Sequence, residues 1–206
     1  GVCTSVPWTE VMKKLGIMAY FSVNQKEAYL NAIHKDWQDR VFLHNADRLE
    51  LGNFPHPKEY HTFSEIKAPA LIKESDFNVS IAPLKKTILK EQPLFSGTVK
   101  NLFGLLPREI YKARSPNSRG KLHRPDVHLA ICDVYECLRP YFHFSVIDLE
   151  CYYESPDWKP DRRNSEPIGM IAYGNNLMDN DLEAIEFMKE LPCKYQNILK
   201  GRNSAK

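Results

Sequence analysis

The chain has 206 residues, 43% of them hydrophobic, with 28 basic and 26 acidic side chains. This composition excludes an intrinsically disordered chain, and a formal net charge of +2 excludes a protein that coats DNA through its overall charge. Because no apolar run approaches the roughly 18 residues of a membrane span, we expect no membrane partner.

The first part of the chain predicts one helix followed by short extended segments. The capping-box-like sequence NQKE predicts a helix over 24–40, and VFLH predicts a short strand over 41–44. The stretch 45–62 contains glycine and two prolines, which predicts irregular structure. The β-rich sequence FNVSIA then predicts a strand over 77–82 that Pro83 ends.

The second part of the chain alternates helices with strands. Helices are predicted after the small-residue turn at Gly97 and over 127–138 and 181–191, and strands over 144–149 and 168–173. This alternation predicts a single α/β domain with a mainly parallel sheet and helices on both faces. Because such sheets bind ligands beyond the carboxyl ends of their strands, we expect the functional site there.

The strongest local signal is the segment 82–104, in which lysines follow a strand and Ser-Gly-Thr opens a helix. Free backbone N–H groups at a helix start, with no side chain on Gly97, are suited to binding an anion. Lys86 and Lys100 would add positive charge. The alternative interpretation is an ordinary helix cap beside two solvated lysines, since the segment matches neither GxxxxGK[ST] nor GxGxxG.

Single histidines and aspartates follow at the predicted ends of elements. His123 ends a long connection, Asp148 ends a strand and Asp181 opens a late helix. Each alone is typical of a turn or a helix cap, whereas together they offer a base, an acid and metal ligands at one sheet edge. His56 and His61 are weaker metal candidates, because a proline between them prevents a shared helix face.

The connection 107–125 carries six basic residues against one acidic residue. A solvated loop explains it most simply, and a lid over an acidic ligand is the sharper interpretation. Nucleic-acid binding through this loop is disfavoured, because Tyr111 is its single aromatic residue and the total charge is near neutral.

The cysteine pattern predicts reduced thiols. The five cysteines include no CxxC pair, so we expect no disulfide, no iron–sulfur cluster and a cytoplasmic location. The cysteines are Cys3, Cys132, Cys137, Cys151 and Cys193.

Five segments resemble the family catalogued as domain of unknown function 362 (DUF362). They are SDFNVSIAPLKKT, SGTVKNLFGLLP, KLH, SVID and YGNNLMDNDLEA, and the resemblance covers about 70–200, with a divergent 1–70. The matching positions are Asp76, Pro83, Lys86, Thr87, Gly97, Lys100, Asn101, Phe103, Gly104, His123, Asp148, Gly174, Asn175 and Asp181.

The resemblance implies a site for a small anionic ligand. Its ligand-binding residues would be Lys86, Thr87, Ser96, Gly97, Thr98, Lys100 and Asn101. His123 and Asp148 would be catalytic, and Asp148 and Asp181 are the metal candidates, while the cofactor and the enzyme activity are left open.

Two departures from the family pattern bear on function. Ile88 replaces a family histidine, and the ferredoxin-like segment of many relatives is absent from this sequence. A redox-related enzyme is therefore implied only by analogy. The alternatives are a non-enzymatic module that works through a protein partner, and nucleic-acid binding through 107–125.

Overall fold

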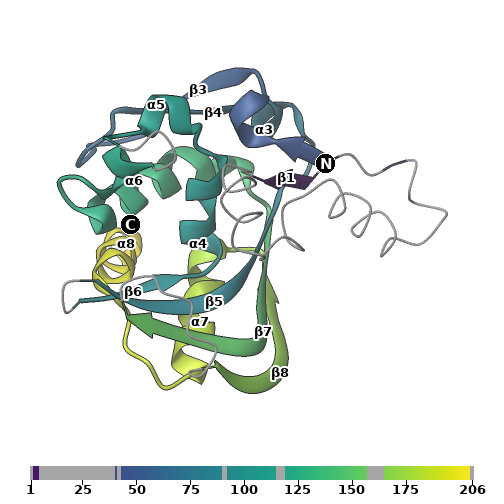
Figure 1. Ribbon diagram of the computed structural model, residues 1–206, viewed down its shortest axis with the longest axis vertical. Coiled ribbons are helices and arrows are strands. Elements are labelled where there is room, and N and C mark those ends of the chain that lie inside the picture. The colour runs from purple at the N-terminus through teal and green to yellow at the C-terminus, as the bar shows by residue number, and fades with distance from the viewer. Residues whose placement is uncertain are drawn as a thin grey trace.

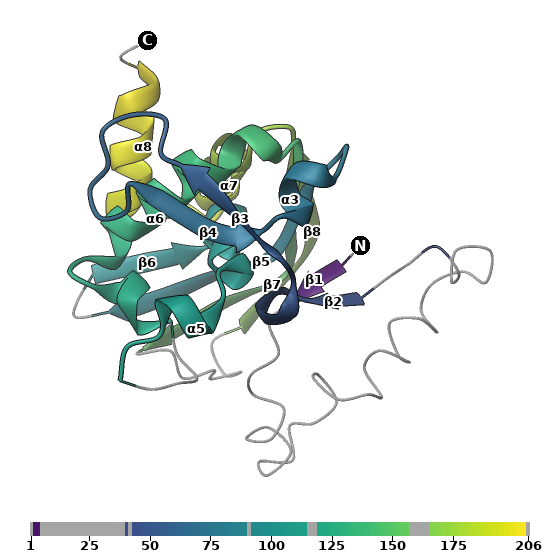
Figure 2. The ribbon, with the colours of Figure 1, turned by 90° about the horizontal axis from the view of Figure 1, so that it is seen from above.

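The computed structural model describes residues 2–4, 40, 43–89, 92–114, 119–156 and 165–204 (Figures 1 and 2). The helix predicted over 24–40 lies outside the described residues apart from Arg40. The strands are β1 (Val2–Thr4), β2 (Leu43–Asn45), β3 (Leu51–Pro55), β4 (Glu65–Pro69), β5 (Val79–Leu89), β6 (Gln92–Ser96), β7 (Phe144–Pro156) and β8 (Ser165–Gly174).

Short and long helices alternate with these strands. The α-helices are α3 (Leu71–Glu74), α4 (Thr98–Asn101), α5 (Arg108–Tyr111), α6 (Val127–Leu138), α7 (Leu177–Phe187) and α8 (Lys194–Ser204). The 3-10 helices are η3 (Ala46–Arg48), η4 (Leu102–Leu105), η5 (Gly120–His123) and η6 (Arg139–Tyr141). No helix in the described ranges combines the length and the apolar character needed to cross a bilayer.

The main sheet has four strands in the order β6-β5-β7-β8. β5 and β7 are parallel, whereas β6 runs antiparallel to β5 and β8 antiparallel to β7. The expectation of a mainly parallel sheet is therefore wrong. The reason is that β6 is the next described element after β5, and β8 the next after β7, and each pairs with the strand that precedes it.

Pro83 does not end the strand that contains it. Asn101 Nδ2 donates to the carbonyl of Ile81 at 3.1 Å, so the backbone of Ile81 faces α4 rather than β7. Pro83 lies two residues after Ile81, so its backbone nitrogen faces the same edge of β5. On that edge, pairing with β6 begins only at Lys85. The missing N–H of Pro83 therefore costs no ladder hydrogen bond, and β5 continues to Leu89.

The two faces of the main sheet differ in how they are covered. Figure 1 shows α4 and α6 above the curved sheet formed by β5 to β8. Ser80, Ala82 and Leu84 are buried on the helix side of β5. On the other side Ile81, Ile171 and Tyr173 remain 64%, 65% and 71% exposed, with no helix over them in the described part of the chain. The expectation of helices on both faces is thus not met, and we call this side the open face.

The core is centred on α6, whose predicted bounds are confirmed. Ala130, Ile131, Val134 and Leu138 are buried in one hydrophobic cluster with residues of the main sheet and of β3–β4. Figure 2 shows the β3–β4 ribbon from above, and both strands contact α6. This packing places η4, η5 and the start of α4 around the same side of the sheet. The single-domain organisation over 1–206 stays a prediction.

Candidate functional site

The Ser-Gly-Thr turn before α4 binds an anion that the protein itself supplies. Asp181, fully buried on α7, accepts hydrogen bonds from Thr98 N at 2.7 Å, Thr98 Oγ1 at 2.6 Å and Val99 N at 3.1 Å. A Cβ atom on Gly97 would lie 2.6 Å from Asp181 Oδ1, so the glycine admits the carboxylate. The expectation that these N–H groups are free for an external ligand is wrong, because Asp181 occupies them.

Asp181 also differs from the helix-opening residue that the sequence predicted. α7 begins at Leu177, where the side chain of Asn176 accepts from Met178 N at 3.0 Å and caps the helix. Burial raises the pKa of Asp181 to about 6, although hydrogen bonds from Thr98 and Val99 lower it. Because its oxygens already bind these donors, Asp181 is a structural carboxylate rather than an open metal ligand.

The second predicted acid, Asp148, lies elsewhere. It sits within β7, not at its end, is exposed, and accepts from Glu150 N at 2.8 Å. β7 extends to Pro156 because it pairs with β5 as far as Ile88, through a segment that the sequence predicted as a polar connection. Among the described residues, no group of three or more histidines, cysteines, aspartates or glutamates is placed to hold a metal ion.

Lys86 and Asn101 have internal partners. Lys86 Nζ lies 2.7 Å from Glu190 Oε1 and 3.3 Å from Glu154 Oε2. Although burial alone lowers it, these two hydrogen-bonded carboxylates raise the pKa of Lys86. Asn101 Nδ2 donates to the Ser80 hydroxyl at 3.2 Å as well as to the Ile81 carbonyl, so it braces α4 against β5. Thr87 and Ser96 are half-buried in β5 and β6.

Three basic side chains from different elements affect one another electrostatically. We call Lys85, Lys100 and His123 the cationic cluster. Burial and the charge of Lys85 lower the pKa of half-buried Lys100 to about 8. Burial and the charge of Lys100 lower the pKa of His123, and burial lowers the pKa of Lys85. Each Coulombic effect requires the two groups to lie near each other.

The backbone explains why these three residues meet. Lys85 pairs with Ser96 across the β5–β6 ladder, and the chain turns there into α4, which carries Lys100 in its first turn. η5, which ends at His123, is fastened to η4 because the Arg119 guanidinium donates to the carbonyls of Gly104 and Leu106. Within the described ranges, no ion pair to a carboxylate joins any member of the cationic cluster.

Sequence reasoning named Lys100 and His123 but missed Lys85. The signal that could have found it is the period of two in β5: Ser80, Ala82 and Leu84 face the core. Continuing that alternation turns Lys86 inward, where its two glutamates lie, and leaves Lys85 exposed. The family pattern drew attention to Lys86 instead.

The basic connection 107–125 uses half of its cations internally. The Arg108 guanidinium pairs with Asp47, Arg119 donates to carbonyls of η4, and Lys121 Nζ donates to the Ile110 carbonyl at 2.8 Å. Tyr111 and Leu122 from the same connection are buried in the core. The connection is therefore anchored by apolar residues, and three of its cations have partners within the protein.

His56 and His61 meet around a buried carboxylate on α6. Asp133 accepts from the backbone N–H groups of His61 at 3.0 Å and Phe63 at 2.9 Å, and His56 Nε2 lies 3.7 Å from Asp133 Oδ1. Nε2 of the His61 ring lies 2.7 Å from Nη2 of Arg202 on α8. These contacts fix the β3–β4 loop on α6, which gives both histidines a structural role.

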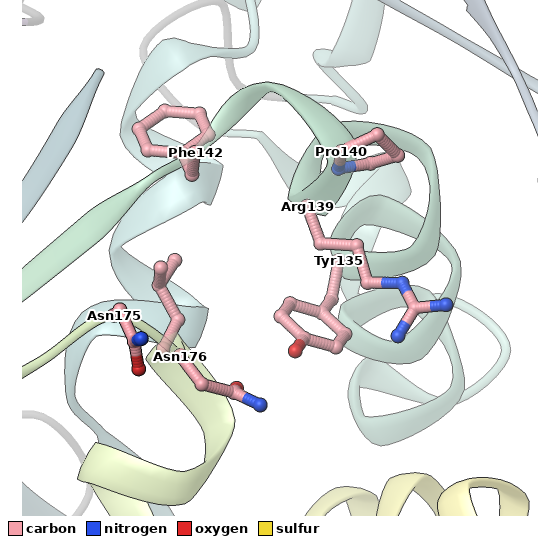
Figure 3. A pocket seen from close by; sticks show the side chains of 7 residues that line it. Tyr135, Arg139, Pro140, Phe142, Asn175 and Asn176 are labelled. Atoms are coloured by element: carbon pink, nitrogen blue, oxygen red, sulfur yellow. The ribbon is translucent and has the colours of Figure 1, made fainter. Parts of the chain in front are cut away.

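A pocket of about 340 Å³ lies between the end of α6 and the start of α7. Figure 3 shows Tyr135 and Arg139 entering from the α6 side and Asn175 and Asn176 from the α7 side. The Arg139 guanidinium already faces the carboxylate of Glu136 at 3.5 Å, and no member of the cationic cluster lines this pocket. The pocket is thus a separate site, with its charge balanced internally.

A family model described as Domain of unknown function (DUF362) matches residues 3–186. Searches of curated proteins and of solved structures each give no match.

Proposed function

We propose that this chain, which belongs to the family described as Domain of unknown function (DUF362), binds a small anion at the cationic cluster. One observation carries the proposal. The charge of Lys85 on β5 lowers the pKa of Lys100 on α4, and the charge of Lys100 lowers the pKa of His123 on η5. None of the three has an ion pair to a carboxylate within the described residues.

Like charges near one another, with Lys100 half-buried among them, destabilise a folded protein unless an anion compensates them. The protein does supply such compensation elsewhere, since Lys86 has Glu190 and Glu154, and Arg108 has Asp47. Among the described residues no carboxylate compensates Lys85 or Lys100, and burial together with the charge of Lys85 lowers the pKa of Lys100. A bound carboxylate or phosphate would supply the missing negative charge and raise that pKa.

The site that we propose differs from the one implied by the family resemblance. Lys100 and His123 are kept, Lys85 replaces Lys86, and Ser96, Gly97 and Thr98 act indirectly by seating α4 on Asp181. Asp148 lies on the open face and is not part of this proposal. His123 brings to the cluster a side chain whose ordinary pKa lies near neutral pH.

Thermal unfolding tests the proposal with inorganic phosphate as the probe, at constant ionic strength. Phosphate at about 100 times its Kd should stabilise the wild type by about 3 kcal/mol. Lys100→Met should lose this stabilisation, whereas Lys112→Met, which removes an exposed lysine of the basic connection, should keep it. Equal stabilisation of the wild type and Lys100→Met, with both folded by circular dichroism, would refute the proposal.

Protein association is a second candidate function, favoured by the open face. Ile81, Ile171 and Tyr173 place exposed apolar surface side by side, since Ile81 pairs with Val146 and Val146 with Tyr173. An apolar patch of this kind is complementary to itself across a two-fold axis, so we propose a second copy of the chain as its partner. Light scattering should give a dimer mass that Ile171→Lys returns to the monomer, and a wild-type monomer at all concentrations would exclude it.

A further inference from the structure

We propose that the pocket between α6 and α7 binds a small aromatic carboxylate through Arg139, Tyr135 and Asn176. This inference goes beyond the anion site at the cationic cluster, because no member of that cluster lines the pocket. The volume of about 340 Å³ falls within the range of small-molecule sites, roughly 300–1,000 Å³.

Three of the four polar side chains that line the pocket offer a ligand only hydrogen-bond donors. The side-chain oxygen of Asn176 accepts from Met178 N at 3.0 Å and Asp179 N at 3.4 Å, so its amide nitrogen is left for a ligand. The hydroxyl of Tyr135, a residue only 3% exposed, has the Arg139 side chain as its hydrogen-bond partner. Because a guanidinium only donates, the hydroxyl keeps its own proton for a ligand. Such a set of donors requires a ligand with acceptor oxygens.

Arg139 supplies the positive charge that a carboxylate needs. Its Nε lies 3.5 Å from Glu136 Oε2, and its Cζ lies 6.0 Å from the centroid of the Tyr135 ring. Glu136 is buried and does not line the pocket, so the guanidinium rather than this carboxylate faces a ligand. Within the described residues Glu136 Oε2 has no hydrogen-bond partner, so the ion pair leaves N–H donors of Arg139 for a ligand. A guanidinium can hold a carboxylate through two parallel hydrogen bonds.

The start of α7 adds to this charge. The helix has 11 residues and begins at Leu177, which lines the pocket, so the positive end of its dipole lies beside the ligand. Asp179 is the acidic residue of its first turn, but it is exposed and does not line the pocket. The helix dipole is therefore a second contribution that favours a negatively charged group over a neutral one.

The remaining wall is apolar and favours an aromatic body. Pro140, Phe142 and Leu177 line it, and the Tyr135 ring lies on the α6 side. Figure 3 shows the rings of Phe142 and Tyr135 separated from each other, with Asn176 extending from the α7 side. An aromatic ring can pack against these surfaces while its carboxylate binds the donors. An aliphatic acid as small as acetate would leave the apolar wall in contact with water.

Isothermal titration calorimetry of the full chain with benzoate tests the inference. Benzyl alcohol, which lacks the charge, and acetate, which lacks the ring, should each bind about tenfold more weakly than benzoate. Asn176→Asp should also weaken benzoate binding about tenfold, because aspartate still caps α7 but replaces the amide donor by a charged oxygen. Tyr135→Phe, which removes only the hydroxyl, should weaken it about fivefold. Circular dichroism checks that both variants are folded.

Two outcomes would overturn the inference. One is the absence of binding to the wild type up to about 10 mM benzoate, the limit expected for a ligand of this size. The other is equal binding of benzoate by the wild type and folded Asn176→Asp.

Lys100→Met separates this pocket from the cationic cluster. This variant should bind benzoate as the wild type does, and Asn176→Asp should keep the stabilisation by phosphate. Loss of the phosphate effect in the wild type, with benzoate binding intact, would overturn the proposed function and leave the pocket. Benzoate binding that disappears in Lys100→Met and survives in Asn176→Asp would assign the carboxylate to the cationic cluster and overturn this inference.

Discussion

Gly97 and Asp181 form a contact that fixes the start of α4. A Cβ atom at position 97 would lie within 2.8 Å of three atoms of the Asp181 carboxyl group, closer than real Cβ contacts. The carboxyl group cannot move away freely, because it accepts from Thr98 N, Thr98 Oγ1 and Val99 N. α4 carries Lys100, so this contact also sets the position of the candidate site.

Gly97→Ala should therefore destabilise the protein by about 3 kcal/mol, since the added methyl group either displaces the carboxylate or shifts α4. Urea unfolding measures the change. Gly104→Ala is the matched control, because a Cβ atom there meets nothing within 4 Å, and it should change stability by less than about 1 kcal/mol. Equal effects of the two substitutions would contradict the assigned contact.

Asp181 should make stability depend on pH in the direction opposite to an ordinary paired carboxylate. Burial raises its pKa to about 6, well above the ordinary value for an aspartate, so the folded state binds a proton more tightly than the unfolded state. Its contribution is present below about pH 4 and is lost as the pH rises to about 6, by about 3 kcal/mol in total. Unfolding free energies of wild type and Asp181→Asn between pH 4 and 7 measure it, and their difference should change over this window. Parallel curves would contradict the shift.

Replacing Lys85 and Lys86 of β5 one at a time should separate anion binding from the ion pairs that stabilise the fold. Lys85→Met should abolish stabilisation by phosphate, whereas Lys86→Met should keep it and lower stability by about 1 kcal/mol, because Glu154 and Glu190 lose their partner. Thermal unfolding with and without phosphate gives both quantities. Loss of the phosphate effect in Lys86→Met alone would restore the site implied by the family pattern.

Binding of an anion should be linked to protonation of Lys100. Because its pKa is about 8 and a bound anion favours the charged amine, phosphate should bind less tightly as the pH rises through 8. Binding at pH 8 should also take up protons, which calorimetry in two buffers of different ionisation enthalpy detects. Lys100→Arg should bind with neither dependence, and a wild type without proton uptake would show that Lys100 is not at the binding site.

Local sequence patterns determined several parts of this structure. The apolar spacing over 127–138 gave α6 with its correct bounds, and three apolar runs became the neighbouring strands β5, β7 and β8. These features depend on contacts between residues close along the chain, or on burial of a whole run, and both leave a periodic trace in the sequence. The motif around Lys100 and Asn101 likewise marked α4 and η4 correctly as helical.

Tertiary structure alone decided the strand directions and the site. An apolar run of strand length is compatible with either direction, so the antiparallel pairing of β8 with β7 and the exposure of its outer face were not visible in the sequence. Asp181 contacts the Gly97 turn although the two lie more than eighty positions apart in the sequence. Lys85, Lys100 and His123, which affect one another electrostatically, likewise come from separate elements. Such proximity arises when separate elements pack on one core, because each side chain's local sequence carries no information about which distant charge will face it.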